Sequence, residues 1–393
     1  MKKKLLFVNG HLNVGGIEKS LVDLLRHLDY SMYDVDLLLL EDKGCYLNIL
    51  PPQVNVIHHD TRKSSGPFFK VLFRNLRKRE FGIILLRLVF VLSPYFGKWM
   101  YKILRPVLGI NTHYDAAIAY RVGLSNEIVA MTTKSDRKIC WWHNGEYKYT
   151  SSQTDKLNEI WSKMDFIISV SKGCKRLLME NAHLDEKKIK IIPNIIDIEA
   201  IERLAGDTNP YPQDGTIDIV TLGRLCWEKH IEDVPLVAHQ LIGMGINNFR
   251  WHIIGDGAKR DEIARRIVQN HLEQKVFMHG SLSNPYPYLK YAHLMVHTSY
   301  IEAHCLTMLE AMSLKTPCVV TKTMLPQDFT EDQANCLIAE QSVESLTKQV
   351  VRMMGILNRS HFLTENAYNM VKVNYSPTQI VSAFTMLLSN SNF

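Results

Sequence analysis

Short apolar runs alternate with helix-patterned segments along almost the whole of this 393-residue sequence. The apolar runs have the length of strands. The segments between them repeat apolar residues at helical spacing, as in Ile17, Leu21, Leu24 and Leu28. Such alternation favours parallel sheets whose faces are covered by helices. The expected strands are Lys4–Asn9, Val35–Leu40, Val54–His58, Ala116–Tyr120, Lys138–Trp142, Phe166–Val170, Ile217–Leu222, Arg250–Ile254, Lys275–His279, Leu294–Thr298, Pro317–Thr321 and Cys336–Ala339.

The length predicts two domains, because a single hydrophobic core rarely grows beyond about 250–300 residues. The alternating pattern occurs in both halves, so the expected fold class is α/β with two doubly wound domains. We expect domains over residues 1–205 and 216–375, with a linker over 206–215 where Asn209-Pro210-Tyr211-Pro212 interrupts regular structure. Ligands of such sheets bind outside the carboxyl ends of the strands, which predicts a cleft between the domains.

The composition is that of an ordinary globular protein, with 46% apolar and 22% charged residues. The seven cysteines are scattered and none forms a C-x2-C pair, so we expect no disulfide framework and no metal site. The apolar run after Met1-Lys2-Lys3-Lys4 is too short for a signal peptide, and no run approaches the ~20 residues of a membrane span. These features predict a cytoplasmic protein.

Most of the net charge of +6 comes from one segment, residues 62–105, which holds eleven Lys or Arg and a single acid, Glu80. Aromatic and aliphatic residues such as Phe69, Phe73 and Trp99 are interleaved with these cations. A basic, amphipathic, aromatic-rich segment predicts attachment to an anionic membrane surface. The ordinary alternative is a solvated helix pair with an apolar core face. Nucleic acid is not expected as a partner, because no nucleic-acid-binding motif accompanies the charge.

Two carboxylates eight residues apart, Glu302 and Glu310, mark the most informative junction. The first follows an expected strand, and the second lies in a short apolar helix, Leu306–Leu314. A strand-loop-helix junction in an open α/β sheet directs its loop and helix N-terminus toward a ligand. Both carboxylates can accept hydrogen bonds from sugar hydroxyls. For two glutamates taken alone, a solvated loop residue and a helix residue are the ordinary alternative.

Five segments, in order, resemble the landmarks of retaining nucleotide-sugar glycosyltransferases of the GT-B fold, glycosyltransferase family 4 in particular. The resemblance extends from about residue 4 to about residue 340 of this chain. The segments are a glycine turn, Gly15-Gly16-Ile17-Glu18-Lys19-Ser20-Leu21; an interdomain segment, Ile192-Pro193-Asn194-Ile195-Ile196-Asp197; a diphosphate-binding segment, Gly223-Arg224-Leu225-Cys226-Trp227-Glu228-Lys229; a glycine landmark, Ile253-Ile254-Gly255-Asp256-Gly257; and the two glutamates followed by Ala311-Met312.

The resemblance implies two Rossmann-like domains facing each other across a cleft, and a C-terminal helix over 376–393 that crosses back to the first domain. It also implies a nucleoside-diphosphate sugar as substrate, with no cofactor. Arg224 and Lys229 would neutralise the leaving diphosphate, Glu302 would contact the hexose and Glu310 the ribose. The resulting catalytic residues are Glu302, His143, Arg224 and Lys229, and the donor-binding residues are Gly15, Gly16, Arg224, Lys229, Gly255, Gly280, His304, Cys305, Leu306, Thr307 and Glu310.

Each of these residues also has an ordinary structural interpretation: surface cations after a strand, a strand-helix turn, or a strand-end histidine. The glycine turn is not a P-loop, because Gly16 stands where that motif needs Lys. Asp34-Val35-Asp36 resembles a metal-binding motif of another glycosyltransferase fold, but here it opens a strand. Ala303 and His304 replace the usual Gly and aromatic residue of the family, which leaves the donor sugar open.

The expected function is transfer of a hexose or amino sugar, with retention and without metal, to a lipid-linked or glycan acceptor. Surface polysaccharide assembly at the inner face of the membrane is the expected setting. Two alternatives remain, a GT-B-like nucleotide-sugar epimerase and a non-catalytic nucleotide-sugar-binding protein. Interconversion of a sugar without acceptor would indicate the first, and absence of donor hydrolysis the second.

Overall fold

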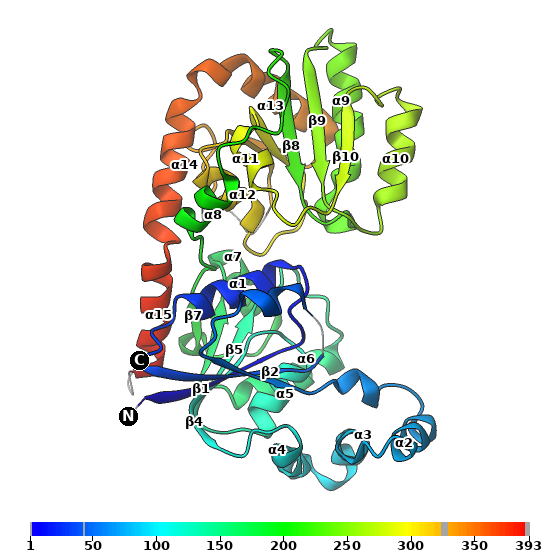
Figure 1. Cartoon of the computed structure of the whole chain (residues 1–393), viewed down its shortest axis with the longest axis vertical. Coiled ribbons are helices and arrows are strands. Elements are labelled where there is room, and N and C mark those ends of the chain that lie inside the picture. Colours follow the sequence, from blue (N-terminus) through cyan, green and yellow to red (C-terminus); the bar gives the residue numbers. More distant parts are fainter. Residues whose placement is uncertain (1, 42–43, 324–328, 390–393) are drawn as a thin grey trace. The chain divides into compact units, whose positions relative to one another are not determined.

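The computed structural model describes residues 2–41, 44–323 and 329–389. These residues form two compact units (Figure 1). Unit 1 comprises the described residues up to Pro193 together with those from Ile380 on, and unit 2 comprises Asn194–Gln379. Each unit contains one parallel sheet with helices on its faces, which confirms the α/β, Rossmann-like fold class.

Unit 1 is built on a seven-stranded sheet with the order β3-β2-β1-β4-β5-β6-β7. Its strands are β1 Lys3–Asn9, β2 Tyr33–Leu39, β3 Val54–His58, β4 His113–Ala119, β5 Lys134–Trp142, β6 Phe166–Ser169 and β7 Ile189–Ile191. Its helices are α1 Gly16–Arg26, α2 Phe68–Arg77, α3 Phe81–Phe96, α4 Leu104–Val107, α5 Leu124–Met131, α6 Ser151–Ser162 and α7 Lys172–Asn181. The interior strand β1 is fully buried from Leu5 to Val8, as expected for a strand covered on both faces.

Unit 2 is built on a six-stranded sheet with the order β10-β9-β8-β11-β12-β13. Its strands are β8 Ile217–Leu222, β9 Phe249–Ile254, β10 Val276–Gly280, β11 Leu294–His297, β12 Cys318–Thr321 and β13 Leu337–Ala339. Its helices are α8 Ile198–Ala205, α9 Val234–Gly243, α10 Arg260–Gln269, α11 Tyr286–Tyr291, α12 Leu306–Ser313, α13 Val343–Ile356 and α14 His361–Asn374.

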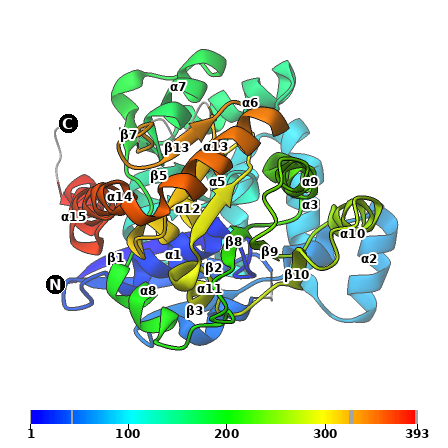
Figure 2. The ribbon, with the colours of Figure 1, turned by 90° about the horizontal axis from the view of Figure 1, so that it is seen from above.

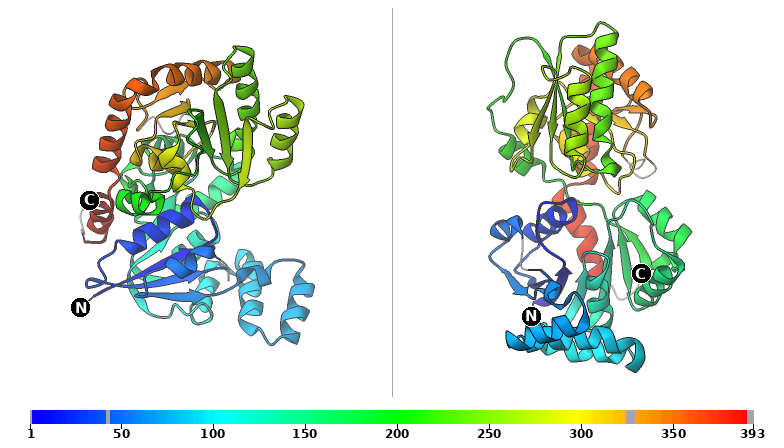
Figure 3. Two further views of the ribbon diagram at one scale, coloured as in Figure 1. Left: turned by 45° about the horizontal axis from the view of Figure 1, so that its top comes forward. Right: turned by 90° about the vertical axis from the view of Figure 1, so that its right-hand side faces the viewer.

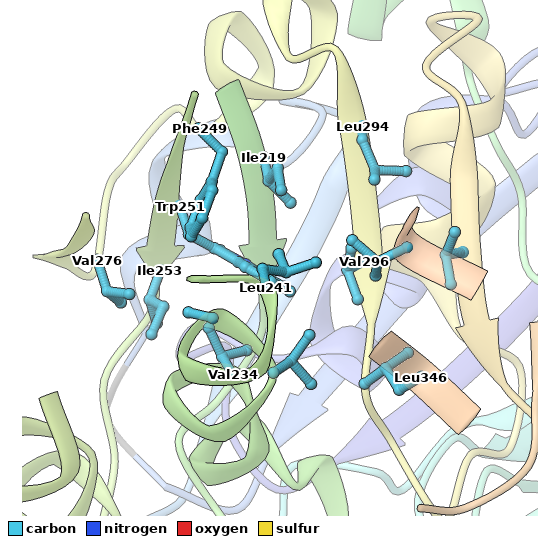
Figure 4. Packing of buried hydrophobic residues seen from close by; sticks show 14 of the residues in the cluster. Ile219, Val234, Leu241, Phe249, Trp251, Ile253, Val276, Leu294, Val296 and Leu346 are labelled. Atoms are coloured by element: carbon cyan, nitrogen blue, oxygen red, sulfur yellow. The ribbon is translucent and has the colours of Figure 1, made fainter. Parts of the chain in front are cut away.

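Alternate residues of the unit 2 strands supply two separate cores. Ile219, Trp251 and Val296 point to the face covered by α9, α10 and α13, where they pack on residues such as Val234 and Leu241 (Figure 4). Their neighbours in sequence point to the opposite face, which is covered by α8, α11, α12 and α14. Figure 2 shows α9 on one side of β8 and β9, with α8 and α11 on the other. This double burial explains why β11, β12 and β13 are almost continuously apolar.

The linker expected at residues 206–215 is wrong, because the two units divide between Pro193 and Asn194. Helix α8 belongs to unit 2, where Ile201 and Ala205 are buried in the core. Tyr211, between the two prolines that suggested a linker, is buried in the same core and donates a 2.7 Å hydrogen bond to the carbonyl of Tyr288. These contacts anchor the segment to unit 2.

The last helix, α15 (Pro377–Ser389), contributes to unit 1 from Ile380 on. Phe384 is fully buried, and its ring lies 6.1 Å from that of Phe7 and 5.6 Å from that of Trp141. The guanidinium of Arg137 donates to the carbonyl of Leu387. The chain therefore returns to its first unit after completing the second.

The basic segment of residues 62–105 forms α2, α3 and α4 with short connecting turns, and α2 and α3 pack on each other beside the sheet of unit 1 (Figure 3). Val71 and Asn75 are the inward-facing residues of α2. Its apolar stripe of Phe69, Phe73 and Leu76 faces solvent instead. Within the described residues, no helix is long and apolar enough to cross a membrane.

Candidate active site

The centre of the candidate site in unit 2 is an ion pair between Lys229 and Glu302. Lys229 ends a 3-10 turn, Trp227–Lys229, that follows β8, and Glu302 lies in the loop after β11. Because β8 and β11 are neighbouring parallel strands, their carboxyl ends bring both loops to one edge of the sheet. Thr298 Oγ1 donates a 2.6 Å hydrogen bond to the carbonyl of Lys229, which ties the two loops together.

Two further side chains complete this buried cluster. His297 Nε2 lies 2.8 Å from Glu302 Oε1 and 3.0 Å from Cys305 Sγ. His297, the last residue of β11, is buried together with Glu302 and Cys305. Cys305 has a left-handed backbone, with φ of 48°, and caps the N-terminus of α12. This conformation, which favours glycine, turns the chain sharply between Glu302 and the helix.

Electrostatics hold this cluster in a defined charge state. Burial alone would raise the pKa of Glu302, but the ammonium of Lys229 and the hydrogen bond with His297 hold that pKa well below its usual range. Burial opposes the charge on Lys229, yet Glu302 raises the pKa of the ammonium. Burial also raises the pKa of the Cys305 thiol well above its ordinary value. The pair is therefore ionised and the thiol is protonated.

Glu310 lies eight residues after Glu302, within α12. It is buried, and its Oε1 accepts a 3.2 Å hydrogen bond from the hydroxyl of Tyr286 at the start of α11. Glu302 and Glu310 thus have different partners, a cation in one case and a phenol in the other. Leu306 and Thr307, in the first turn of α12, are half-buried between them in the sequence.

His304 is buried and contacts two aromatic side chains. Its ring contacts Phe329 and Tyr375 edge-on, at centroid distances of 6.0 Å and 5.3 Å. Burial lowers the pKa of His304 to about 3, so the imidazole is neutral. The side chain occupies an aromatic pocket, which agrees with the aromatic residue usual at this position in the family that the sequence resembles.

Arg224 differs from Lys229 in its surroundings. The residue is exposed, and its guanidinium makes no hydrogen bond to any residue that the structure describes. The guanidinium of Arg224 is near enough to Glu228 to help lower the pKa of that carboxyl, but its hydrogen-bond donors face solvent, whereas the ammonium of Lys229 is paired with Glu302.

The backbone itself, through close packing or a positive φ, also explains why the predicted donor-binding residues Gly255 and Gly280 are glycines. Gly255 has φ of 137°, and a Cβ there would lie 1.9 Å from the carbonyl oxygen of Gly223. The backbone of the loop after β9 therefore approaches the Arg224 loop more closely than a side chain would permit. Gly280, the last residue of β10, also has a positive φ, of 70°, and its carbonyl accepts a hydrogen bond from the amide of Gly255. Their roles in donor binding stay predictions.

A second cluster of polar side chains lies around the glycine turn in unit 1. Gly15 precedes α1, and Glu18 in its first turn is buried, with Oε1 3.1 Å from Arg121 Nη1 and 3.6 Å from His11 Nδ1. A Cβ at Gly15 would lie 2.3 Å from Glu18 Oε2, so the turn and the carboxylate fit closely. The sequence interpretation did not assign a role to His11, Glu18 or Arg121. The Glu18 carboxylate within the glycine motif was the signal that could have drawn attention to them.

His143 directly follows β5. Its ring is stacked with Trp141, at 6.1 Å and 10°, and lies 4.9 Å from the ring of Tyr120. The hydroxyl of Tyr120 is 3.1 Å from Ser20 Oγ on α1. The structure therefore places His143 at the carboxyl edge of the unit 1 sheet, where the predicted acceptor-side residues were expected.

Two family models match the chain. Glycosyltransferase Family 4 matches residues 14–200, and Glycosyl transferases group 1 matches residues 209–370. The fold agrees with solved glycosyltransferase structures. Anabaena Alr3699/HepE in complex with UDP and glucose has a TM-score of 0.74 at 15% identity, covering 98% of this chain and 99% of that one. Staphylococcus aureus TarM in complex with UDP has a TM-score of 0.73 at 16% identity, covering 99% and 100%. The chain belongs to the GT-B glycosyltransferases of the family 4 type.

Several curated glycosyltransferases are similar to this chain in sequence. Poly(ribitol-phosphate) alpha-N-acetylglucosaminyltransferase of S. aureus (strain COL) is 32% identical over 136 residues, which is 34% of this chain and 27% of that protein. An uncharacterized glycosyltransferase of Methanocaldococcus jannaschii is 24% identical over 57% of this chain and 59% of its own length. The chain thus spans between a quarter and about three fifths of these two relatives. A Campylobacter jejuni enzyme, N-acetylgalactosamine-N,N'-diacetylbacillosaminyl-diphospho-undecaprenol 4-alpha-N-acetylgalactosaminyltransferase, is 25% identical over 90% of both chains.

Proposed function

We propose that this protein transfers a sugar from a nucleoside-diphosphate sugar to a lipid-linked or glycan acceptor, with retention of anomeric configuration. The observation that supports the proposal is the ion pair between Lys229 and the buried carboxylate of Glu302 at the carboxyl edge of the unit 2 sheet. An ionised carboxylate at this edge can accept hydrogen bonds from sugar hydroxyls. Glu310, eight residues later on α12, is then in reach of a different part of the same donor, which we assign to the ribose.

Departure of the nucleoside diphosphate requires positive charge, because negative charge accumulates on the phosphate as the glycosidic bond breaks. Arg224 supplies an exposed guanidinium that can bind phosphate with two hydrogen bonds. Lys229 adds a second cation that stays charged in its buried setting. We infer that these two residues, with no metal ion, neutralise the leaving group.

In the proposed reaction, the bond between the anomeric carbon and the diphosphate oxygen breaks while the acceptor hydroxyl oxygen bonds to the same face of that carbon. The proton of the hydroxyl passes to an oxygen of the departing phosphate, so atoms and charge balance. The name of the C. jejuni relative includes a lipid diphosphate, and that of the S. aureus relative includes a phosphate-linked polymer. Both names support an acceptor in surface polysaccharide assembly.

The test is a panel of nucleotide sugars, screened by thermal shift and followed by product analysis. A donor present at about 100 times its dissociation constant adds about 2.7 kcal/mol of stability. The anomeric configuration of the product is then determined by nuclear magnetic resonance. An inverted product would contradict retention. Conversion of the donor sugar without acceptor would indicate an epimerase, and binding without turnover or hydrolysis a non-catalytic protein.

We also propose that α2 and the segment that follows it attach the protein to an anionic membrane on the cytoplasmic side. The side chains of Phe69, Phe73 and Trp99 are 69%, 68% and 61% exposed. Phe69, Phe73 and Leu76 are spaced so that they share one face of α2, and the exposure of that face argues against the alternative of a solvated helix pair with its apolar face in a core. Cations of the same helix and its C-terminal turn are exposed beside them, namely Arg74, Arg77, Lys78 and Arg79.

A further inference from the structure

The buried cluster around Glu302 contains a set of metal-ligand atoms that the sequence interpretation did not expect. His297 Nε2, a carboxylate oxygen of Glu302 and Cys305 Sγ all lie within 4.8 Å of one another. All three residues are buried, and they come from the end of one strand, the following loop and the N-cap of one helix. This arrangement is not a chance grouping of mobile surface side chains, because the strand end and helix cap fix two of the three residues.

The donor set decides which ion would fit. One imidazole nitrogen, one thiol sulfur and one carboxylate oxygen make a set of intermediate softness that suits Zn²⁺, whereas Mg²⁺ and Ca²⁺ prefer oxygen ligands alone. Around tetrahedral Zn²⁺ the nitrogen and sulfur would lie about 3.6 Å apart. They are 3.0 Å apart here, as hydrogen-bonded partners. The cluster therefore needs to open by only about half an ångström to admit the ion.

Access and a fourth ligand come from an adjoining cavity. His297 and Cys305 both line a cavity of about 270 Å³ in unit 2, whose other walls include Thr321 and Asp332. A cavity of this size readily holds water. Three protein ligands and a water on the open side are the usual complement of a zinc site that is not closed.

We propose that Zn²⁺ binds to His297, Glu302 and Cys305 and, in doing so, separates Glu302 from Lys229. The S–H bond of Cys305 breaks as the Zn–S bond forms, and the proton is released to solvent. The thiolate and the carboxylate together balance the charge of the ion. The Lys229 ammonium then loses its carboxylate partner, since the ion takes the oxygen that it contacts.

Antagonism between Zn²⁺ and the sugar donor follows, and this part of the inference rests on the proposed function. If Glu302 and Lys229 bind the nucleotide sugar, an ion that occupies one and displaces the other lowers donor affinity. By thermodynamic reciprocity, the donor lowers the affinity for Zn²⁺ by the same factor as Zn²⁺ lowers the affinity for the donor. We expect this factor to be about tenfold or more.

The binding experiment uses the full chain, purified in the reduced state, and two probes. Zn²⁺ is titrated against a chromophoric chelator, and Co²⁺ is added as a spectroscopic substitute. We expect a Co²⁺ charge-transfer band typical of thiolate ligation, and a site whose Zn²⁺ affinity falls about 100-fold or more in Cys305→Gly and in His297→Gln. Glycine suits the left-handed backbone at residue 305, so the first variant removes the thiol without a backbone penalty. Cys45→Ser, which removes an exposed thiol, is the matched control and should leave the site intact.

A Co²⁺ spectrum without thiolate ligation, or equal Zn²⁺ affinity in the wild type and Cys305→Gly, would overturn the proposal. Circular dichroism of each variant separates loss of the site from loss of the fold. A second experiment measures, by calorimetry, the affinity for the nucleotide sugar that binds most tightly in the donor panel. It compares the affinity with and without Zn²⁺, in the wild type and in Cys305→Gly. If no nucleotide sugar binds, the proposed function fails while the metal titration still decides the zinc site. If the donor binds equally well with and without Zn²⁺ in the wild type, the antagonism is refuted.

Discussion

Lys229 and Glu302 form a largely buried ion pair although they lie 73 positions apart in the sequence. The side chains are only 18% and 8% exposed. A buried pair of this kind contributes little net stability by itself, but removal of one partner leaves the other as an uncompensated charge. A substitution of either residue should therefore change both the stability of unit 2 and the donor binding that we assign to the pair.

That coupling predicts different outcomes for single and double variants. Lys229→Met should lower turnover by roughly 100-fold or more, as expected for loss of one charge contact in the transition state, and should also destabilise the protein by about 3–5 kcal/mol. Adding Glu302→Gln should recover most of the stability and none of the activity. Arg224→Gln should lower turnover on the same scale without the loss of stability, because Arg224 is exposed. Denaturant unfolding and steady-state kinetics measure the two effects, and near-normal turnover in both single variants would remove these residues from the mechanism.

The two carboxylates should divide the donor between them. Glu310→Gln should weaken binding of the bare nucleoside diphosphate, because we assign Glu310 to the ribose. Glu302→Gln should mainly reduce discrimination among donor sugars. Calorimetry with the nucleoside diphosphate alone tests this division, with Tyr286→Phe as a control that removes the hydrogen bond to Glu310 while retaining its carboxylate. Equal losses of nucleotide affinity in both glutamate variants would contradict the assignment.

Transfer should not require an added divalent ion, because Arg224 and Lys229 supply the positive charge. A strong chelator should leave turnover essentially unchanged, measured with and without added Mg²⁺ or Mn²⁺. The alternative metal ligand Asp36 already accepts hydrogen bonds from Tyr114 and Asn55, at 2.8 Å and 2.7 Å. Turnover that disappears with chelator and returns with Mn²⁺ would show that the catalytic charge is incomplete without a metal.

Membrane attachment should depend on the cations beside the exposed stripe of α2. Each attracts anionic headgroups by about 1 kcal/mol near the surface, and buried Phe and Leu side chains add a contribution that salt does not screen. Binding to anionic vesicles should therefore weaken as salt rises without disappearing. Co-sedimentation at two salt concentrations compares the wild type with a variant neutralised at Arg74, Arg77, Lys78 and Arg79.

A control variant loses the same number of exposed cations from unit 2, at Arg260, Arg265, Lys348 and Lys372. We expect release from vesicles in the α2 variant alone, with turnover on a soluble acceptor analogue preserved. Equal vesicle binding by all three proteins would mean that the α2 cations only face solvent.

The folded protein should become less stable in mild acid, because protonation of His279 favours the unfolded state. Burial, together with the neighbouring His252, lowers the pKa of His279 in the folded protein. The unfolded chain then binds a proton more readily, so the contribution of His279 is complete above the unfolded pKa of about 6.5 and is lost as pH decreases below it. His279→Gln should reduce the loss in unfolding midpoint between pH 7.5 and pH 5.5. The exposed His239→Gln is the control, and an unchanged loss in His279→Gln would refute the prediction.

The strands could be predicted from the sequence because the interior strands, such as β1 and β11, are buried on both faces and therefore form apolar runs. Every expected strand is present, and two of them, Val54–His58 and Ile217–Leu222, have the expected bounds. The missed strand, β7, has only three residues and carries Lys190 at its centre. The linker could not be located from Pro210 and Pro212, because the burial of Tyr211 between them depends on tertiary packing.

The site could be predicted only in part. The junction of strand, loop and helix correctly indicated where Glu302 and Glu310 would lie in unit 2. The contacts of His297 with Glu302 and Cys305 depend on the left-handed turn at Cys305, and no local pattern in the sequence specifies that turn. The neutral charge of His304 likewise depends on Phe329 and Tyr375, which are distant in the sequence.

Helix α15 affects the order in which this chain can be completed during synthesis. The first 193 residues emerge from the ribosome long before Phe384 is synthesised. In the finished unit 1, the ring of Phe384 packs against those of Phe7 and Trp141. All of unit 2 is made in between, an interval of roughly 10 to 40 s at ordinary rates of translation. During that time the nascent first unit exposes an aromatic surface that a chaperone or a neighbouring chain can contact. The domain that begins first is therefore the one that finishes last.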